Sequence, residues 1–380
     1  MSGRGVWRGI GQAGPALFGL YLYLGSGLFA TFVTAINTQW SLQWLYTQFT
    51  IVLMFTFGLG LVRSAKQIHS LIWLVVACLS YAAWVLNSQY YFDGFNRIWL
   101  KGFGGGDNNG GAMIFVMAVP VTFFLAIQEK RIWLKWLCLV GVLMQIHVVL
   151  MSFSRGSQLG LCIVGAAIFA TAMLTLPRKG LTLLLAIVFV VLGLQLAGEE
   201  VRDRFSTIFV DKGERDASAA SRFDTWKAAL ACIQDHPLGV GPRGFNLISH
   251  QYGLAPNKSV HNLFLQTGAD YGLLGTAGLA FFYVVTMWKC FWLALDPIAR
   301  RLVWPRFYGT GCCIALGGLM VCSQFIGMES IEAGYIIALL GTCTLCHVDR
   351  IRQVESQAEL LPPLELEQVP VPGEEQWQTA

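Results

Sequence analysis

Charged side chains are scarce in this chain of 380 residues, and that scarcity argues against a soluble protein. Asp, Glu, Lys and Arg make up 13% of the sequence, whereas hydrophobic residues make up 55%. A soluble protein carries about 25% charged residues, so this chain has too few polar groups to cover a globular surface in water. The length accommodates about ten apolar helices of roughly 20 residues, the length that crosses a bilayer. The composition therefore predicts a polytopic membrane protein.

Motifs for metal and cofactor chemistry are also lacking. The sequence has no HExxH, no paired Cys/His ligands and no Asp-rich motif, so it predicts neither a bound metal nor a cofactor. The glycine-rich stretch Gly102–Gly111 is not followed by Gly-Lys-Ser/Thr, which excludes a phosphate-binding loop. A flexible loop and a role in gating lipid access are the two interpretations left for it. The net charge of +4 is small and indicates no nucleic-acid partner.

The apolar segments predict an all-α protein with about ten transmembrane helices. Their ranges are 16–35, 43–62, 70–86, 111–127, 132–151, 158–176, 181–197, 263–288, 307–325 and 331–347. The first segment is too long for a cleavable signal peptide and lacks a small-residue cleavage site, so we expect it to stay as a span.

Lys and Arg alternate between the connecting segments, which predicts an orientation. Short basic connectors lie at residues 4–8, 63–66, 130–135, 178–179 and 300–306. Basic residues concentrate on the cytoplasmic side, so we expect both termini in the cytoplasm.

The predicted organisation has four parts. Residues 1–197 hold the first seven spans, 198–262 form one large periplasmic loop with amphipathic helices, and 263–347 hold the last three spans. Residues 348–380 are rich in Glu, Gln and Pro and are predicted to be a disordered cytoplasmic tail. An outer turn carries Glu329 and Glu332, for which the pattern suggests no role.

Arg155 is a cation on the side of the membrane where Lys and Arg are scarce. It lies in the turn 152–157 between two apolar segments, so its guanidinium is expected at the outer interface. A snorkelling arginine that anchors a helix end is one interpretation. Binding of a phosphate group is the other, and we favour it because a guanidinium forms bidentate bonds to phosphate. His147 precedes Arg155 by eight residues, which predicts roughly the same helix face for both.

The large loop is predicted to contain an amphipathic helix that starts at Arg222 and ends before Pro237. Ser221 and Asp224 have capping-box spacing. The expected apolar stripe consists of Phe223, Trp226, Leu230 and Ile233. The helix dipole disfavours a cation at the first helical position unless an anion joins it, so Arg222 is a second candidate phosphate ligand. An exposed arginine with its head in water is the alternative.

His261 lies where the loop meets the eighth predicted span. There it can reach both water and lipid headgroups, and a helix start favours the neutral imidazole that a general base needs. A bound pyrophosphate would shift its pKa the other way. His236 and His250 are expected at the surface, and Arg243 and Asp270 are further candidates for substrate binding.

Several of these motifs resemble the O-antigen ligase family. They are Phe153-Ser-Arg-Gly156, Asp216–Arg222 followed by Trp226, Pro237–Gly241, and His261–Gln266 followed by Gly272. The stretch Gly106–Asn109 leading to Pro120 is similar to the family's subgroup of O-glycosylation ligases found beside exosortase systems. The resemblance covers residues 100–290, and elsewhere the chain matches the family only in hydropathy.

The resemblance implies a membrane glycosyltransferase of the GT-C type in the bacterial inner membrane. Such an enzyme transfers a glycan from a polyprenyl pyrophosphate carrier to a hydroxyl of lipid A-core or of a protein, on the periplasmic side, with inversion and without metal. Carried over to this chain, Arg155 and Arg222 would bind the pyrophosphate and His261 would accept the proton, with His147, Arg243 and Asp270 near the substrates. Family members usually have Glu where this chain has Asp270, and many have more N-terminal spans.

Two other functions compete with this interpretation. An O-antigen or capsule polysaccharide polymerase of the same superfamily would use the same three residues, with another lipid-linked glycan as the acceptor. A lipid or solute transporter would be expected to have interrupted helices or buried ion pairs in the middle of the membrane. His147 is the strong mid-span candidate for such a site.

Overall fold

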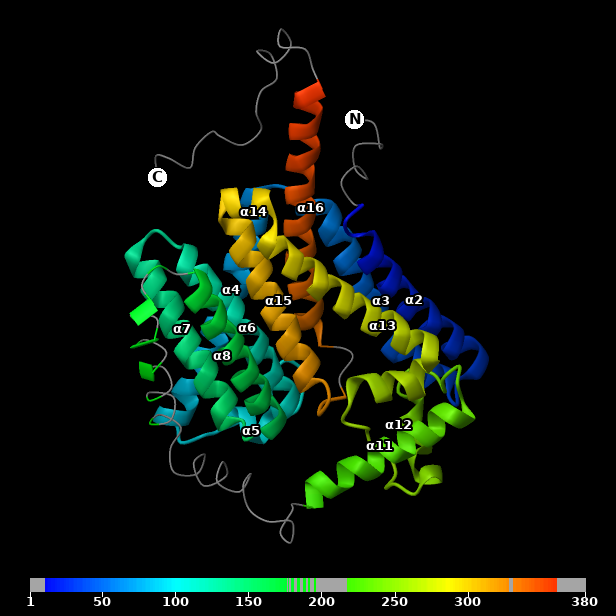
Figure 1. The fold of residues 1–380 in the computed structure, drawn as a ribbon. Coiled ribbons are helices and arrows are strands. Elements are labelled where there is room, and N and C mark those ends of the chain that lie inside the picture. Colours follow the sequence, from blue (N-terminus) through cyan, green and yellow to red (C-terminus); the bar gives the residue numbers. More distant parts are fainter. Residues whose placement is uncertain are drawn as a thin grey trace.

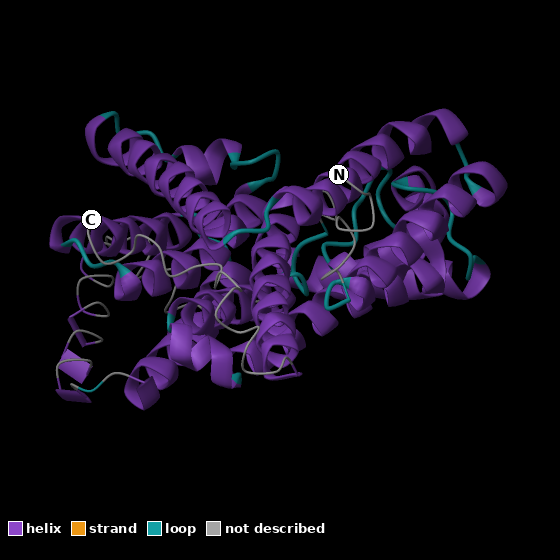
Figure 2. Ribbon diagram, turned by 90° about the horizontal axis from the view of Figure 1, so that it is seen from above, coloured by secondary structure: helices purple, strands orange, loops and turns teal. Residues whose placement is uncertain are grey.

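A computed structural model describes residues 11–175, 217–327 and 331–360, together with isolated positions between 177 and 195. Within these ranges the chain forms helices, and its β contact is an isolated bridge between Phe103 and Gly106 (Figure 2). The helices are α2 (Gly14–Phe29), the π-helix η1 (Ala30–Thr34), α3 (Thr38–Leu61), α4 (Ala65–Phe92), α5 (Arg97–Lys101), α6 (Asn108–Gln128), α7 (Ile132–Met151), α8 (Arg155–Thr175), α11 (Ala217–Asp235), α12 (Gly244–Ile248), the 3-10 helix η4 (Ser249–Tyr252), α13 (Leu263–Leu295), α14 (Pro297–Leu302), α15 (Trp304–Cys322) and α16 (Glu332–Leu360).

Seven of the described helices are long and apolar enough to cross a bilayer. They are α2 with η1, α3, α4, α6, α7, α8 and α13. Helices α15 and α16 occupy the predicted spans 307–325 and 331–347 and pack within the same bundle (Figure 1). The predicted span 181–197 lies outside the continuously described residues, and so does Glu329. The structure thus confirms an all-helical protein with multiple membrane helices, whereas the count of ten stays a prediction.

Helix α6 lies at the centre of one half of the bundle, where α4, α7, α8 and α15 surround it. Of its most apolar stretch 89% is buried, whereas the same fraction is 22% for α4 and for α8. Helices α4 and α8 therefore lie nearer the outside of the bundle, and α6 is enclosed by its neighbours. Because α6 is fixed, the residue that caps its N-terminus is fixed as well.

Helices α2 and α13 approach each other closely at small residues. A Cβ atom added to Gly19 would lie 2.8 Å from the carbonyl oxygen of Gly278, so neither backbone leaves room for a side chain there. Small residues allow such close approach between membrane helices. This contact fixes the first helix against the helix that follows the large loop.

Helix α13 is broken at Gly272, whose φ of 76° and ψ of −179° are accessible essentially to glycine alone. The loop segment before α13 packs into the break, since a Cβ on Gly272 would lie 2.7 Å from the carbonyl oxygen of Pro237. The amide of Leu273 donates to the carbonyl oxygen of Pro237 at 3.0 Å. Helix α13 is therefore interrupted, as would be expected of a transporter, but here the loop is attached at the interruption.

Part of the large loop folds on a small apolar core of its own. Its buried members are Ala228, Ala229, Cys232, Val240, Phe245, Ile248, Val260 and Ala269. The helix α11 differs from its predicted form, because Phe223 and Leu230 of the expected apolar stripe are 56% and 49% exposed. The buried face of α11 instead carries small residues, which let the helix lie close to the start of α13.

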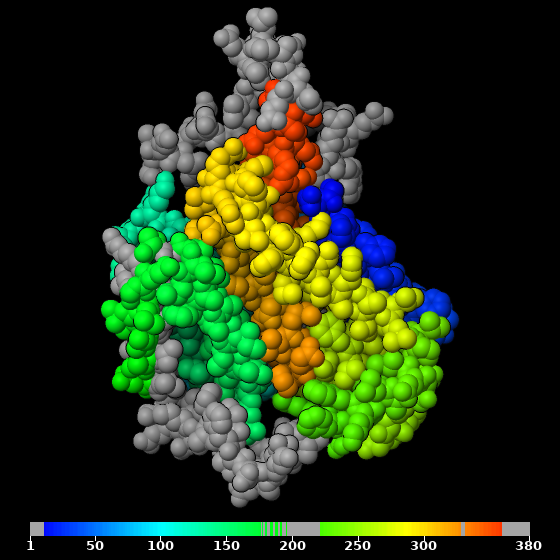
Figure 3. All heavy atoms as spheres, viewed as in Figure 1, coloured from blue at the N-terminus to red at the C-terminus, as the bar shows by residue number. Residues whose placement is uncertain are grey.

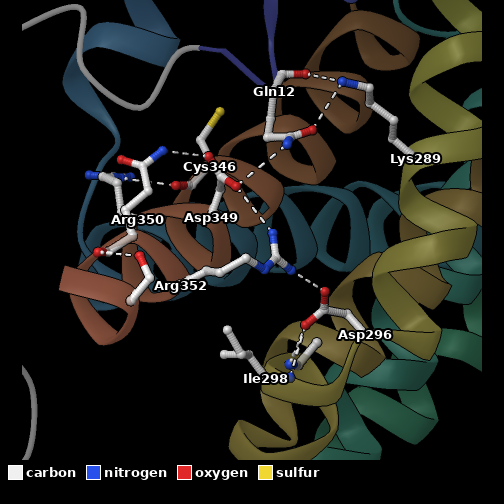
Figure 4. A network of polar contacts seen from close by, with 11 residues as sticks. Gln12, Lys289, Asp296, Ile298, Cys346, Asp349, Arg350 and Arg352 are labelled. Atoms are coloured by element: carbon white, nitrogen blue, oxygen red, sulfur yellow. Dashed lines mark hydrogen bonds and ion pairs between the residues drawn. The ribbon is translucent and has the colours of Figure 1, made fainter. Parts of the chain in front are cut away.

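Different helices form the two ends of the molecule. Helices α11 and α12 lie at one end, and α14, the C-terminal part of α16 and the start of α2 lie at the other (Figure 1). At this second end Lys289 donates to the carbonyl oxygen of Gln12 at 2.6 Å, and Arg352 pairs with Asp296 and Asp349 (Figure 4).

The last helix corrects the predicted tail. Helix α16 continues to Leu360, so residues 348–360 are helical rather than disordered, and 361–380 lie outside the described residues. The contacts of Arg352 with Asp296 of the neighbouring helix and with Asp349 one turn earlier stabilise this extension.

We expect the end that carries α11 to face the periplasm. A cysteine at Lys258 should react with an impermeant thiol reagent in intact spheroplasts, whereas a cysteine at Lys130 should react only after permeabilisation. The unsubstituted chain, with ten free cysteines, gives the background labelling. The reverse pattern would overturn this orientation.

Candidate active site at the loop end of the bundle

Arg155 projects from a tightly bonded turn between α7 and α8. The hydroxyl of Ser152 donates to the carbonyl oxygen of Val149 at 2.7 Å and accepts from the amide of Ser154 at 3.2 Å. Phe153 between them has a φ of 54°. The turn is buried, but Arg155 itself is exposed at the first position of α8. The predicted turn between two apolar helices is thus confirmed, whereas the place of the Arg155 guanidinium at the outer interface stays a prediction.

His147 does not share a helix face with Arg155, because α7 ends at Met151 and Arg155 belongs to α8. That prediction is wrong, since helical periodicity does not continue through a turn. His147 points toward α4, where its Nδ1 lies 2.5 Å from Oδ1 of Asn87 and its Nε2 lies 3.2 Å from the hydroxyl of Tyr91. It lines a cavity of about 420 Å³ between α4 and α7.

The partners of His147 define its protonation state. The Asn87 amide nitrogen donates to the carbonyl oxygens of Ala83 and Met144, so Oδ1 must be the acceptor of the Nδ1 proton. The Tyr91 hydroxyl can then donate to Nε2. Nδ1 of His147 thus carries a proton, the imidazole joins two spans, and its role in substrate binding stays a prediction.

Arg222 lies in the second turn of α11, because the helix begins at Ala217. The prediction that the helix starts at Arg222, with Ser221 and Asp224 as a capping box, is wrong, and the helix-start amides no longer explain a cation here. The guanidinium carbon of Arg222 lies 5.9 Å from the centre of the Phe325 ring.

Burial lowers the pKa of Arg222, the nearby charge of Arg155 lowers it further, and Asp107 opposes both. Arg155 and Arg222, which are far apart in sequence, are therefore close enough in space to repel each other. A phosphate group between them would relieve this repulsion.

His261 immediately precedes the cap of α13 and has a φ of 54°. Oδ1 of Asn262 accepts from the amides of Phe264 and Leu265, and the amide of Leu263 donates to the carbonyl oxygen of Ser323 at 2.8 Å. The segment after α15 also approaches from the other side, since a Cβ on Gly327 would lie 3.2 Å from the His261 nitrogen. The backbone around His261 is thus held between the loop and the segment after α15, and Nε2 of His261 lies 3.4 Å from the hydroxyl oxygen of Ser259.

The pKa of His261 is lowered, chiefly by burial. The charge of Asp107 raises this pKa, whereas Arg222, Lys258 and Arg243 lower it. The direction agrees with the neutral form expected from the sequence, although burial rather than the helix start is the main cause. His236 and His250 are exposed, as predicted.

Asp107 is an acidic residue of this site that the sequence analysis did not single out. It caps α6, where Oδ1 accepts from the amide of Gly110 at 2.9 Å and Oδ2 accepts from the Asn109 amide nitrogen at 3.1 Å. The neighbouring Asn108 side chain donates to the carbonyl oxygen of Ser152, which ties the glycine-rich turn to the turn before Arg155. An aspartate directly before a helix-forming run was the available signal.

Asp270 and Arg243 make contacts that hold the loop. Asp270 is fully buried, and its carboxylate accepts from the amide of Phe245 at 2.9 Å and from the Gln266 side chain at 2.7 Å. The Arg243 guanidinium carbon lies 4.6 Å from the ring centre of Trp44 on α3, a cation–π contact. Their predicted contacts with substrate stay predictions.

The charged groups meet around the end of α15. Four different elements supply them. Arg155 begins α8 and Arg222 lies on α11. His261 lies just before α13, and Asp107 caps α6. In the space-filling view the orange end of α15 lies between α8 and the loop that carries α11 (Figure 3). This arrangement can bind an anion and accept a proton beside it.

The part of the chain that carries this arrangement is similar to known proteins. Residues 140–280 match the family described as O-antigen ligase, and this range contains Arg155, Arg222 and His261. An uncharacterised protein of Haemophilus influenzae is 24% identical over 182 residues, which cover 43% of this chain and 45% of that protein. The chain thus matches less than half the length of this relative. The chain thus contains, within its bundle of membrane helices, a region over residues 140–280 that is similar to the O-antigen ligase family.

Proposed function

We propose that the protein is a glycosyltransferase that joins a glycan from a polyprenyl pyrophosphate carrier to an acceptor hydroxyl at the periplasmic face of the bacterial inner membrane. The convergence of Arg155 and Arg222 on Phe325 carries this proposal, because the Arg222 guanidinium carbon lies 5.9 Å from the Phe325 ring centre and a Cβ on Gly156, next to Arg155, would lie 2.8 Å from the Phe325 side chain. Two guanidinium groups that repel each other at the loop end of the bundle favour a multivalent anion between them, and a pyrophosphate supplies that charge. Two separate snorkelling arginines would have no reason to meet.

The reaction uses His261 as the general base. The acceptor hydroxyl oxygen attacks the anomeric carbon of the first sugar while the bond from that carbon to the pyrophosphate oxygen breaks. The hydroxyl proton passes to the His261 imidazole, the pyrophosphate leaves with the bonding electrons, and the configuration at the anomeric carbon inverts. Arg155 and Arg222 stabilise the negative charge that develops on the leaving group.

Asp107 balances this site. Burial and the charges of Arg222, Lys258 and Arg243 lower the pKa of His261, and the charge of Asp107 raises it. The same carboxylate opposes the mutual repulsion of the two arginines in the absence of substrate. We assign it to the tuning of the base and to the positioning of the cations.

The acceptor separates the proposed ligase from a polymerase. A ligase would use the hydroxyl of lipid A-core or of a protein, and a polymerase would use a second lipid-linked glycan. The three residues serve both reactions, so assays with each acceptor in parallel decide between them.

Arg155→Lys and Arg222→Lys should each lower transfer by about tenfold or more, because an ammonium cannot form the bidentate bonds of a guanidinium. The measurement is glycan transfer from polyprenyl pyrophosphate by purified protein at matched concentration. Arg300→Lys, at the opposite end of the molecule and exposed, is the control and should keep full activity. Full activity in both site variants would show that these arginines only anchor helix ends.

His261→Ala should leave donor binding intact but lower single-turnover transfer by roughly 10² to 10⁴. The arginines still hold the pyrophosphate in this variant, whereas the proton has no acceptor. His250→Ala removes an exposed histidine of the same loop and should change neither quantity. Near-normal turnover would eliminate His261 as the base, and a loss of donor affinity would make it a binding residue.

Asp107→Asn should shift the acidic limb of the pH–rate profile to lower pH. The carboxylate raises the pKa of His261, so its removal lowers that pKa and keeps the imidazole neutral in more acidic solution. Asparagine still caps α6. Asp93→Asn, an exposed residue at the C-terminal end of α4, is the control and should leave the limb in place. A shift to higher pH in Asp107→Asn would contradict the assigned role.

A further inference from the structure

A second cavity lies on the loop, between α11 and the turn that follows η4. Its volume is about 480 Å³, which falls within the range of small-ligand sites. The residues that line it are Asp224, Lys227, Ala228, Ala231, Tyr252, Gly253 and Leu254. None of these residues belongs to the catalytic group described above.

Small residues keep this groove open. Ala228 and Ala231 are separated by three residues on α11, so they lie on the same helix face and leave space above the backbone. The opposite wall turns sharply at Gly253, whose φ is 77°. A larger side chain at either alanine would fill the groove.

The aromatic ring in the groove is held in place. The hydroxyl of Tyr252 donates to Oδ2 of Asp235 at 3.1 Å. Its ring is stacked on that of Phe245, with centroids 6.2 Å apart and an interplanar angle of 29°. Since Tyr252 is only partly buried, part of this fixed ring is accessible to a ligand.

The polar side chains favour a ligand rich in hydroxyl groups. Asp224 accepts hydrogen bonds and Lys227 donates them, both are exposed, and they lie one helical turn apart. A polyanion would be repelled by Asp224, and a lipid chain would leave both charges without partners. Sugar hydroxyls both donate and accept, and the C–H face of a pyranose ring packs on an aromatic ring.

We propose that this groove binds the glycan of the donor, beyond the sugar that is linked to pyrophosphate. This inference rests on the proposed function. Arg222 and Ala231 lie on opposite faces of the same helix, with a rise between them of roughly 14 Å along the axis at 1.5 Å per residue. A glycan whose pyrophosphate sits at Arg222 can cross α11 near Asp224 and continue along the groove. Binding at this distance from the reaction favours donors with several sugars.

Two variants test the groove without touching the catalytic group. Ala231→Trp fills it, and the double variant Asp224→Ala with Lys227→Ala removes its polar side chains. With a donor that carries several repeat units, each should raise KM by about tenfold and leave kcat unchanged. With a donor that carries one sugar, neither should change KM. Gln234→Trp is the matched control, because Gln234 is exposed on the same helix and does not line the groove.

The outcomes separate the groove from the proposed function. An unchanged KM for the long donor in both variants, or an equal rise in KM with both donors, would overturn the proposal that the groove binds glycan.

A second experiment applies if the unsubstituted protein transfers neither donor. The proposed function then fails, and calorimetry with the free oligosaccharide tests the groove alone. Binding that is lost in both variants and kept in Gln234→Trp supports it, whereas no binding to the unsubstituted protein overturns it. Thermal unfolding of each variant verifies that it is folded.

Discussion

The segment Pro237–Gly241 lies in the break of α13, and the position of the candidate base relative to the cations depends on that contact. The amides of Val240 and Gly241 donate to the carbonyl oxygens of Ala269 and Asp270, and Leu273 bonds back to Pro237. The approach is so close that a Cβ on Gly239 would lie 2.5 Å from the Asp270 carbonyl oxygen. Helix α11 ends just before this segment and His261 lies just before α13, so one junction orients both.

The junction explains why buried polar groups occur at the loop end of a membrane helix. The break at Gly272 would leave backbone groups of α13 without partners, which is costly next to lipid. The loop supplies those partners, and the Asp270 carboxylate extends the network to the amide of Phe245. A helix interruption that could have opened a path through the membrane instead fastens a loop to its surface.

The site built on this junction concentrates positive charge, which costs folding energy. Burial lowers the pKa of Arg222, and Arg155 adds repulsion to that cost. In the proposed function, the pyrophosphate bound beside these arginines offsets their repulsion. The charge of Asp107 raises the pKa of both Arg222 and His261, so one carboxylate acts on both parts of the proposed reaction.

Local patterns in the sequence determined much of the architecture. Each span predicted from hydropathy that falls within the continuously described residues is a helix. The basic connectors near Lys130 and Arg300 distinguished one end of the bundle from the other. The motifs around Arg155, Arg222 and His261 were sufficient to indicate the O-antigen ligase family. These features can be predicted from the sequence because each segment that crosses lipid must itself be apolar and helical.

Only the tertiary structure decided which of these residues meet. It placed Arg155 beside Arg222 and brought in Asp107, while it turned His147 toward α4 and buried Asp270 in the junction. The start of α11 at Ala217 was also not predictable, because a local capping pattern at Ser221 competes with packing that the sequence does not display. Electrostatic proximity depends on contacts between segments far apart in the chain, and no periodicity within one segment encodes them.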